Sequence, residues 1–142
     1  MRWPISKGMA RPTSALIIDD EAHVRTYFRL MLGELNIMTQ WEAADGAKGM
    51  ELALAHRPSL ILLDIHLPVL DGLEVLARLG REAPEIPVIM VTARTSIEAV
   101  RDAQELGAVG YLIKHLPREE ALKGLRAAID GLDELVEDER AL

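Results

Sequence analysis

The sequence predicts an α/β fold, a (βα)5 doubly wound sandwich in which one five-stranded parallel sheet has helices on both faces. Short apolar runs alternate with longer segments whose apolar residues recur every three or four positions. Three of the five runs are almost continuously apolar, which is typical of strands that are covered on both sides. Strands alternating with helices favour right-handed crossovers and therefore a parallel sheet.

The expected elements begin at Ser14 and follow one another without an internal repeat. The expected strands cover residues 15–18, 37–43, 60–63, 88–91 and 108–113. The expected helices cover residues 21–35, 45–56, 70–82, 95–106 and 118–130. In the first helix one apolar face is formed by Val24, Tyr27, Phe28, Met31 and Leu35. Residues 1–13 show no periodicity, so we expect a flexible N-terminal extension followed by one domain over residues 14–130.

The last helix leaves two interpretations open. A 3-4-3-4 spacing, the pattern of a coiled-coil seam, is formed by Leu122, Leu125, Ile129, Leu132 and Val136. In the first interpretation this helix packs on the sheet and frays near Gly131, so that residues 131–142 form an acidic tail. In the second, the helix continues and presents a seam for a homodimer or a linker. We favour the first.

The composition excludes or disfavours several classes of protein. With 142 residues, 49% apolar and 27% charged, the chain has the size and balance of one folded domain. Its longest apolar runs are far below the ~20 residues of a membrane helix, so we expect a cytoplasmic protein without membrane contact. The absence of cysteine excludes disulfides and thiolate chemistry. A net charge of −7 without a Lys/Arg cluster argues against direct nucleic-acid binding by this chain.

Reactive side chains follow the expected strands at the edge where ligands of open parallel sheets gather. The first strand is followed by Asp19 and Asp20, the third by Asp64, the fourth by Thr92 and the fifth by Lys114. Helix capping would explain one aspartate at each helix start. It does not explain a pair of aspartates, a third carboxylate, a hydroxyl and an ammonium at neighbouring strand ends.

This set resembles the receiver-domain family of response regulators in two-component signal transduction, the CheY-like family. The matching residues are Asp19-Asp20-Glu21, Asp64 followed by Pro68 and Asp71-Gly72, Thr92-Ala93, and Tyr111 three positions before Lys114. The resemblance spans residues 14–130. It implies a flavodoxin-like sheet of strand order 2-1-3-4-5.

The resemblance also implies a Mg2+ site. Direct oxygen ligands would come from the carboxylates of Asp20 and Asp64 and from the backbone carbonyl of His66, while Asp19 would hold a metal-bound water. Elementary electrostatics agrees, because carboxylates ~5 Å apart repel by roughly 3 kcal/mol per pair at an effective dielectric of ~20. Hard oxygen ligands of this kind suit Mg2+.

Asp64 is by resemblance the phosphoacceptor. Its donor would be a phosphohistidine on a sensor histidine kinase or a histidine phosphotransfer protein. Thr92 and Lys114 would contact the phosphoryl oxygens, so that the domain catalyses its own phosphorylation and dephosphorylation without being a separate enzyme. Thr92 and Tyr111 would form the switch, changing contacts of the fourth helix, fifth strand and fifth helix with an effector protein or effector domain.

One departure from the family concerns the loop after Lys114. The family usually has proline next, through a cis bond, whereas this chain has Lys114-His115-Leu116-Pro117. A cis bond before a residue other than proline costs ~2.5–4 kcal/mol, so we expect a trans bond and a reshaped loop. The four histidines lack ligand spacing and are expected to be solvated or capping, with His23 and His115 bordering the site.

Two other functions remain as alternatives. A receiver-like interaction module that works without phosphorylation fits the altered loop. A phosphohydrolase of the haloacid-dehalogenase type fits poorly, because it needs Asp-x-Asp where this chain has adjacent aspartates. The sequence leaves open the cognate kinase, the output and whether the domain stands alone or belongs to a longer protein.

Overall fold

A five-stranded parallel sheet forms the centre of the molecule in the computed structural model, which describes residues 11–93 and 98–141, with side chains up to Leu132. The strand order is β2-β1-β3-β4-β5, and all four pairings are parallel. The strands are β1 (Ser14–Ile18), β2 (Thr39–Ala43), β3 (Ile61–Asp64), β4 (Val88–Thr92) and β5 (Gly110–Ile113). The predicted fold class and strand order are therefore confirmed.

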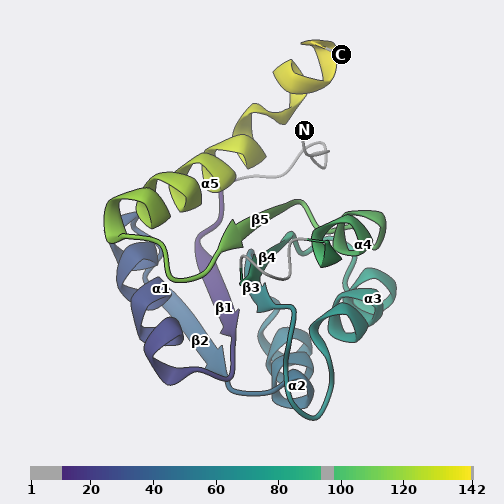
Figure 1. Cartoon of the computed structure of the whole chain (residues 1–142). Coiled ribbons are helices and arrows are strands. Elements are labelled where there is room, and N and C mark those ends of the chain that lie inside the picture. The colour runs from purple at the N-terminus through teal and green to yellow at the C-terminus, as the bar shows by residue number, and fades with distance from the viewer. Residues whose placement is uncertain (1–10, 94–97, 142) are drawn as a thin grey trace.

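Helices cover both faces of this sheet, α1 and α5 on one side and α2, α3 and α4 on the other (Figure 1). Their bounds are α1 (Ala22–Glu34), α2 (Gly46–His56), α3 (Gly72–Glu82), α4 (Ala99–Glu105) and α5 (Arg118–Ala141). The fourth expected helix began at residue 95, and residues 94–97 lie outside the described part, as do residues 1–10 of the expected N-terminal extension. Over the described residues, no helix combines the length and the apolar character needed to span a bilayer.

Alternation along the strands divides the core into two apolar layers. Ala15 and Ile17 of β1 point into the layer under α1 and α5. Leu16 and Ile18 point into the layer under α2, α3 and α4. This is the period of two that a strand buried on both faces requires. All four side chains are at most 1% exposed, so β1 is an interior strand and its carboxyl end is held firmly.

The last helix continues through Gly131 to Ala141, beyond the end that our favoured interpretation gave it. Leu125, Ile129 and Leu132 are each at most 2% exposed and pack in the layer against the sheet. Burial of Leu132 outweighs the cost of about 1 kcal/mol for a glycine inside a helix. The seam positions up to Leu132 therefore serve the core of the domain. Val136 lies outside the described side chains, and a homodimer stays a prediction.

Candidate functional site

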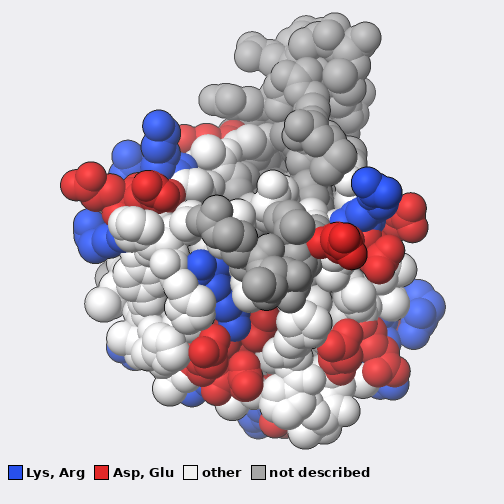
Figure 2. All heavy atoms as spheres, viewed as in Figure 1, with Lys and Arg blue, Asp and Glu red and all other residues white. Residues whose placement is uncertain are grey.

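The candidate site lies where four neighbouring strands end. Asp19 follows β1, Asp64 ends β3, Thr92 ends β4 and Lys114 follows β5. Because the strands are parallel and adjacent in the order β1, β3, β4, β5, their carboxyl ends meet at one edge. On the face in Figure 2, acidic side chains gather beside basic ones near this edge.

The ammonium group of Lys114 stands at the centre of this site. Its Nζ lies 2.9 Å from Asp19 Oδ2, 2.9 Å from Glu21 Oε2 and 2.9 Å from Asp64 Oδ2. The side chains of Lys114, Asp19 and Asp64 are buried, whereas Glu21 is partly exposed. The structure thus brings together the expected residues 19, 64 and 114, and Lys114 reaches Asp64 despite the altered loop.

Burial sets the protonation chemistry of the two aspartates. It raises the pKa of Asp64 to about 6, against the opposing effect of its hydrogen bond with Lys114. Burial also raises the pKa of Asp19. The hydrogen bond from Lys114 lowers the pKa of Glu21. Burial by itself would lower the pKa of Lys114, but its close contacts with the three carboxylates outweigh this and raise the pKa, so the ammonium stays charged.

The acidic residues after β1 fit a hard divalent cation. Carboxylate oxygens of Asp19, Asp20 and Glu21 all lie within 4.8 Å of one another. Asp19 Oδ1 accepts a hydrogen bond from the Glu21 amide at 2.9 Å. Asp19 Oδ2 is buried and, although it is close to the Lys114 ammonium, receives no well-directed hydrogen bond among the described residues. Lys114 supplies one positive charge against the carboxylates of Asp19, Glu21 and Asp64, so the pocket keeps an excess of negative charge that suits a divalent cation such as Mg2+.

Two expected metal contacts remain predictions. Asp20 is exposed beside Asp19, in the position of a ligand that an ion could reach from solvent. His66 donates its backbone N–H to Asp64 Oδ1 at 3.3 Å, which orients the carboxylate of Asp64. The role expected of the His66 carbonyl, and the sharing of one ion by Asp20 and Asp64, are not tested by these contacts.

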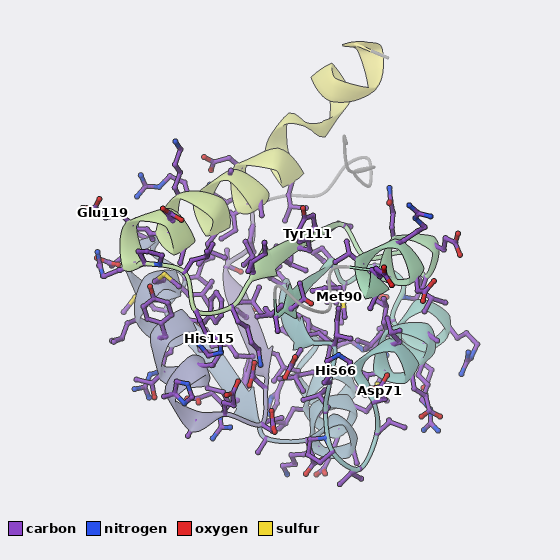
Figure 3. The ribbon with its side chains drawn as sticks, viewed as in Figure 1. His66, Asp71, Met90, Tyr111, His115 and Glu119 are labelled. Atoms are coloured by element: carbon purple, nitrogen blue, oxygen red, sulfur yellow. The ribbon has the colours of Figure 1, made fainter. Side chains whose placement is uncertain are left out.

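Thr92 and Tyr111, the two expected switch residues, occupy different environments. Thr92 is fully buried, and its hydroxyl donates to the Ala93 carbonyl at 3.0 Å. Its own carbonyl accepts from the Lys114 amide at 2.8 Å, so these two residues are neighbours across β4 and β5. Tyr111 lies opposite Met90 in the sheet and is 38% exposed (Figure 3). Their switching role stays a prediction.

The loop between β3 and α3 packs tightly under Asp64. The Gly72 amide donates to the Ile65 carbonyl at 2.9 Å, and a Cβ atom at Gly72 would lie 2.0 Å from the Asp64 carbonyl oxygen. Only glycine fits there. The Leu70 amide donates to the Pro68 carbonyl at 2.8 Å, which makes residues 68–70 a γ-turn.

The loop between β5 and α5 has a different construction. No cis peptide bond occurs among the described residues, so the Lys114–His115 bond is trans, as predicted. His115 has a φ of 64° and its ring stacks on that of His23, with centroids 5.9 Å apart. The Tyr27 hydroxyl donates to the Leu116 carbonyl at 3.3 Å and ties this loop to α1.

Sequence reasoning missed two residues that shape the site. Glu21 was part of the acidic motif but received no role, and it holds Lys114. Arg25 donates from Nη1 to the Asp19 carbonyl at 2.7 Å and from Nε to Glu42 Oε1 at 3.1 Å. It therefore braces the end of β1. The acidic triplet was a usable signal for Glu21, whereas nothing in the spacing pointed to Arg25.

Comparison with known proteins agrees with this geometry. The family described as response regulator receiver domain matches residues 15–126. The nitrate/nitrite response regulator NarL of Escherichia coli K12 is 35% identical over 121 residues, which are 84% of this chain and 56% of that protein. The transcriptional regulatory protein PdtaR of Mycobacterium tuberculosis H37Rv is 29% identical over 126 residues, which are 89% of this chain and 61% of that protein.

Solved structures show the same fold. The receiver domain of AraT, a response regulator from Geobacillus stearothermophilus, superposes with a TM-score of 0.75 at 29% identity, covering 89% of this chain and 97% of that one. The chemotaxis response regulator CheY4 of Vibrio cholerae gives a TM-score of 0.73 at 27% identity, covering 82% and 98%.

This chain belongs to the response regulator receiver domain family of two-component systems. Domains of this family act in signalling that is controlled by phosphorylation, and they generally bind Mg2+. The chain spans between half and two thirds of the length of the curated relatives it matches.

Proposed function

We propose that Asp64 accepts a phosphoryl group in a Mg2+-dependent reaction and that this modification switches the protein contacts of the domain. The observation that carries the proposal is the position of the Lys114 ammonium, 2.9 Å from an oxygen of Asp64 and 2.9 Å from an oxygen of Asp19. A carboxylate, a counter-charge for a phosphoryl group and an acidic metal site thus share one pocket. The same observation disfavours a module that works without phosphorylation.

Asp19, Asp20, Asp64 and the His66 carbonyl would hold the ion. When bound, Mg2+ supplies charge neutralisation for the phosphoryl oxygens. The excess of carboxylates over the single Lys114 ammonium supports this assignment, since a second cation would offset the remaining negative charge. The exposed Asp20 beside it supplies a second carboxylate from the same turn.

The residues of this chain carry out the rest of the chemistry. An oxygen of Asp64 attacks phosphorus, the bond to the donor nitrogen breaks, and an acyl phosphate forms. Lys114 holds one phosphoryl oxygen by its ammonium, because it already contacts the oxygen that would be modified or its neighbour. Thr92 turns its hydroxyl from the Ala93 carbonyl toward another phosphoryl oxygen. Hydrolysis of the acyl phosphate at the same site returns the domain to its first state.

The switch follows from the movement of Thr92. Drawing its hydroxyl toward the site empties space beside β5, into which Tyr111 turns from its exposed position. The surface of α4, β5 and α5 then changes its contacts with an effector protein or effector domain. Such a change biases two states that already exist.

The partners follow from the family. The donor is a sensor histidine kinase or a histidine phosphotransfer protein, and the reaction takes place in the cytoplasm. The regulators NarL and PdtaR extend beyond the matched region, so an effector in the same protein or in another one is compatible with this domain. These are expectations for this chain.

The test is chemical phosphorylation with acetyl phosphate and Mg2+, followed by intact-protein mass spectrometry. The wild type should gain about 80 Da, the mass of one phosphoryl group, whereas Asp64→Asn or excess chelator should abolish the gain. Asp45→Asn is the matched control, because it changes the capping aspartate of α2. A wild type that gains no mass would overturn the proposal and favour the phosphorylation-independent interaction module.

A further inference from the structure

Two histidines and a glutamate from separate elements meet at the mouth of the phosphorylation site. His23 lies in the first turn of α1, and His115 lies in the loop between β5 and α5 (Figure 3 labels His115). Their rings stack with centroids 5.9 Å apart and an interplanar angle of 23°. Glu21 lies between them, with Oε1 4.0 Å from His23 Nε2 and Oε2 4.0 Å from His115 Nε2.

Burial of apolar surface does not explain this arrangement. The side chains of His23 and His115 are 71% and 57% exposed, so the stack removes little area from water. His115 moreover occupies the left-handed region with a φ of 64°, which costs a residue other than glycine roughly 1 kcal/mol. An exposed imidazole is thus held over a carboxylate by a strained backbone, and strain of this kind gathers at functional sites.

We propose that Glu21, His23 and His115 bind a transition-metal ion of the Zn2+ type at a second position that adjoins the Mg2+ site. Two imidazole nitrogens and one carboxylate group form a donor set typical of Zn2+ sites that leave a position open for water. Ligand bonds of ~2.0–2.2 Å place tetrahedral ligand atoms roughly 3.3 Å apart. Each imidazole lies 4.0 Å from a different oxygen of the Glu21 carboxylate, so each nitrogen–oxygen distance has to shorten by less than 1 Å around an ion that both oxygens face.

The chemistry of the donors separates the two sites. Asp19 and Asp20 offer only oxygen atoms, which suit Mg2+, whereas imidazole nitrogen favours the transition metals. Glu21 connects the sites, because its Oε2 also lies 2.9 Å from Lys114. An ion at the histidines would compete with Lys114 for this oxygen. Occupancy of the Zn2+ site and the state of the phosphorylation site are therefore coupled, and the coupling is reciprocal.

The test is calorimetric titration of the whole chain with Zn2+ in the presence of excess Mg2+, so that the carboxylate site is already filled. We expect one Zn2+ per chain. Affinity should fall at least about tenfold in His23→Ala and in His115→Ala, since even partners outside the ligand set are worth that much. His56→Ala is the matched control, an exposed histidine at the end of α2 and outside the site. Circular dichroism checks that the variants remain folded.

A second measurement identifies the ligands. Co2+ in place of Zn2+ should give the intense visible absorption of a four-coordinate site in the wild type and in His56→Ala. That absorption should be lost in His23→Ala and His115→Ala. Absence of Zn2+ binding under excess Mg2+, or binding that survives both substitutions, would overturn the inference. Because neither titration requires phosphorylation, failure here leaves the proposed function standing, and failure of phosphorylation leaves this site standing.

Discussion

The β3–α3 loop and the β5–α5 loop flank the same pocket, and each contains a non-glycine residue with positive φ. In the first loop it is Val69, with a φ of 68°, and in the second it is His115, with a φ of 64°. The two loops hold these residues at similar φ values by different means. The first relies on main-chain hydrogen bonds and close packing, the second on side-chain contacts and charge.

Backbone contacts fix the β3–α3 loop at both ends. The Gly46 amide at the start of α2 donates to the Pro68 carbonyl at 3.4 Å, and the Gly72 amide donates to Ile65. Cβ atoms at Gly46 or Gly72 would approach carbonyl oxygens to 1.9 or 2.0 Å. Val69 points into solvent, 81% exposed, so its side chain contributes little to the position of the loop.

Charged and polar side chains fix the β5–α5 loop. Lys114 is held by three carboxylates, His115 by its stack on His23, and the Leu116 carbonyl by Tyr27. These contacts respond to protons, ions and a phosphoryl group, whereas the packing of the first loop does not. The comparison indicates that one loop is a rigid support for Asp64 and the other is the responsive side of the pocket.

The largest effect should come from Lys114→Met, which removes the charge that holds the second loop. Three carboxylates lose their shared counter-charge, two of them buried, so the free energy of unfolding should fall by about 3–5 kcal/mol at neutral pH without Mg2+. Urea unfolding measures this, and Mg2+ should restore part of the loss. Lys123→Met, on the exposed face of α5, is the control and should change stability by under about 0.5 kcal/mol. Equal losses in both variants would contradict the central role of Lys114.

Gly72→Ala, where the β3–α3 loop meets α3, should cause a comparable loss in the free energy of unfolding. The added Cβ would overlap the Asp64 and Ile65 carbonyl oxygens, which are backbone atoms and cannot turn away. We expect a loss of about 3 kcal/mol that Mg2+ does not restore. Gly80→Ala, in the same helix and with its nearest neighbour at 3.8 Å, should instead stabilise the protein by about 0.5–1 kcal/mol. A loss in Gly72→Ala that Mg2+ restores would erase the distinction between the loops.

The charge on Asp64 makes the free energy of unfolding depend on pH. Burial raises the pKa of this carboxyl to about 6 from 3.8, so the folded state binds the proton more tightly than the unfolded state. Stability should therefore fall as pH rises between these two values, with a penalty of about 3 kcal/mol fully present above pH 6. Without divalent ions, Asp64→Asn should be more stable than the wild type by up to this amount at pH 8.

The advantage of Asp64→Asn should shrink to about half at pH 5, where the folded wild type is mostly protonated at this carboxyl. Urea unfolding at the two pH values measures the change. Asp45→Asn serves as the control for loss of an aspartate outside the pocket. An advantage of Asp64→Asn that stays constant with pH would show that lost packing or hydrogen bonding, and not charge, determines it.

The smallest effect should come from Val69→Asn. Asparagine tolerates the left-handed region, whereas a β-branched residue is strained there, so we expect about 1 kcal/mol of added stability. Thermal unfolding measures it as a rise in Tm. Val69→Ala also removes the β-branch and most of the exposed apolar surface, but it lacks the polar side chain by which asparagine hydrogen-bonds the nearby backbone, and should gain less. Equal gains in both variants would assign the effect to the apolar surface.

Much of this arrangement could be predicted from the sequence because parallel strands end at one edge. That rule predicts that Asp19, Asp64 and Lys114 lie together, and the distances between them confirm it. Element bounds differed by a few residues, as with β3, expected at 60–63 and found at Ile61–Asp64. Strand position is determined by burial of apolar runs, which the sequence displays directly.

The missed features depend on loop conformation and on partners distant in sequence. The stack of His23 on His115 requires the positive φ of His115, and no local sequence pattern predicts that conformation. The contact of Glu21 with Lys114 joins residues from two loops. The continuation of α5 depends on burial of Leu132, which outweighs the preference of Gly131 for a helix end. In each case tertiary packing decides among conformations that local preferences leave open.

Lys114 is anchored at both its main chain and its side chain. Its amide donates a hydrogen bond to the Thr92 carbonyl at the carboxyl ends of β4 and β5. Its ammonium contacts Asp64 on β3. One residue therefore links the tips of three strands mechanically, so that a shift of the β4 tip displaces the ammonium as well. Amide hydrogen exchange at this single position is a label-free reporter of both the sheet edge and the pocket.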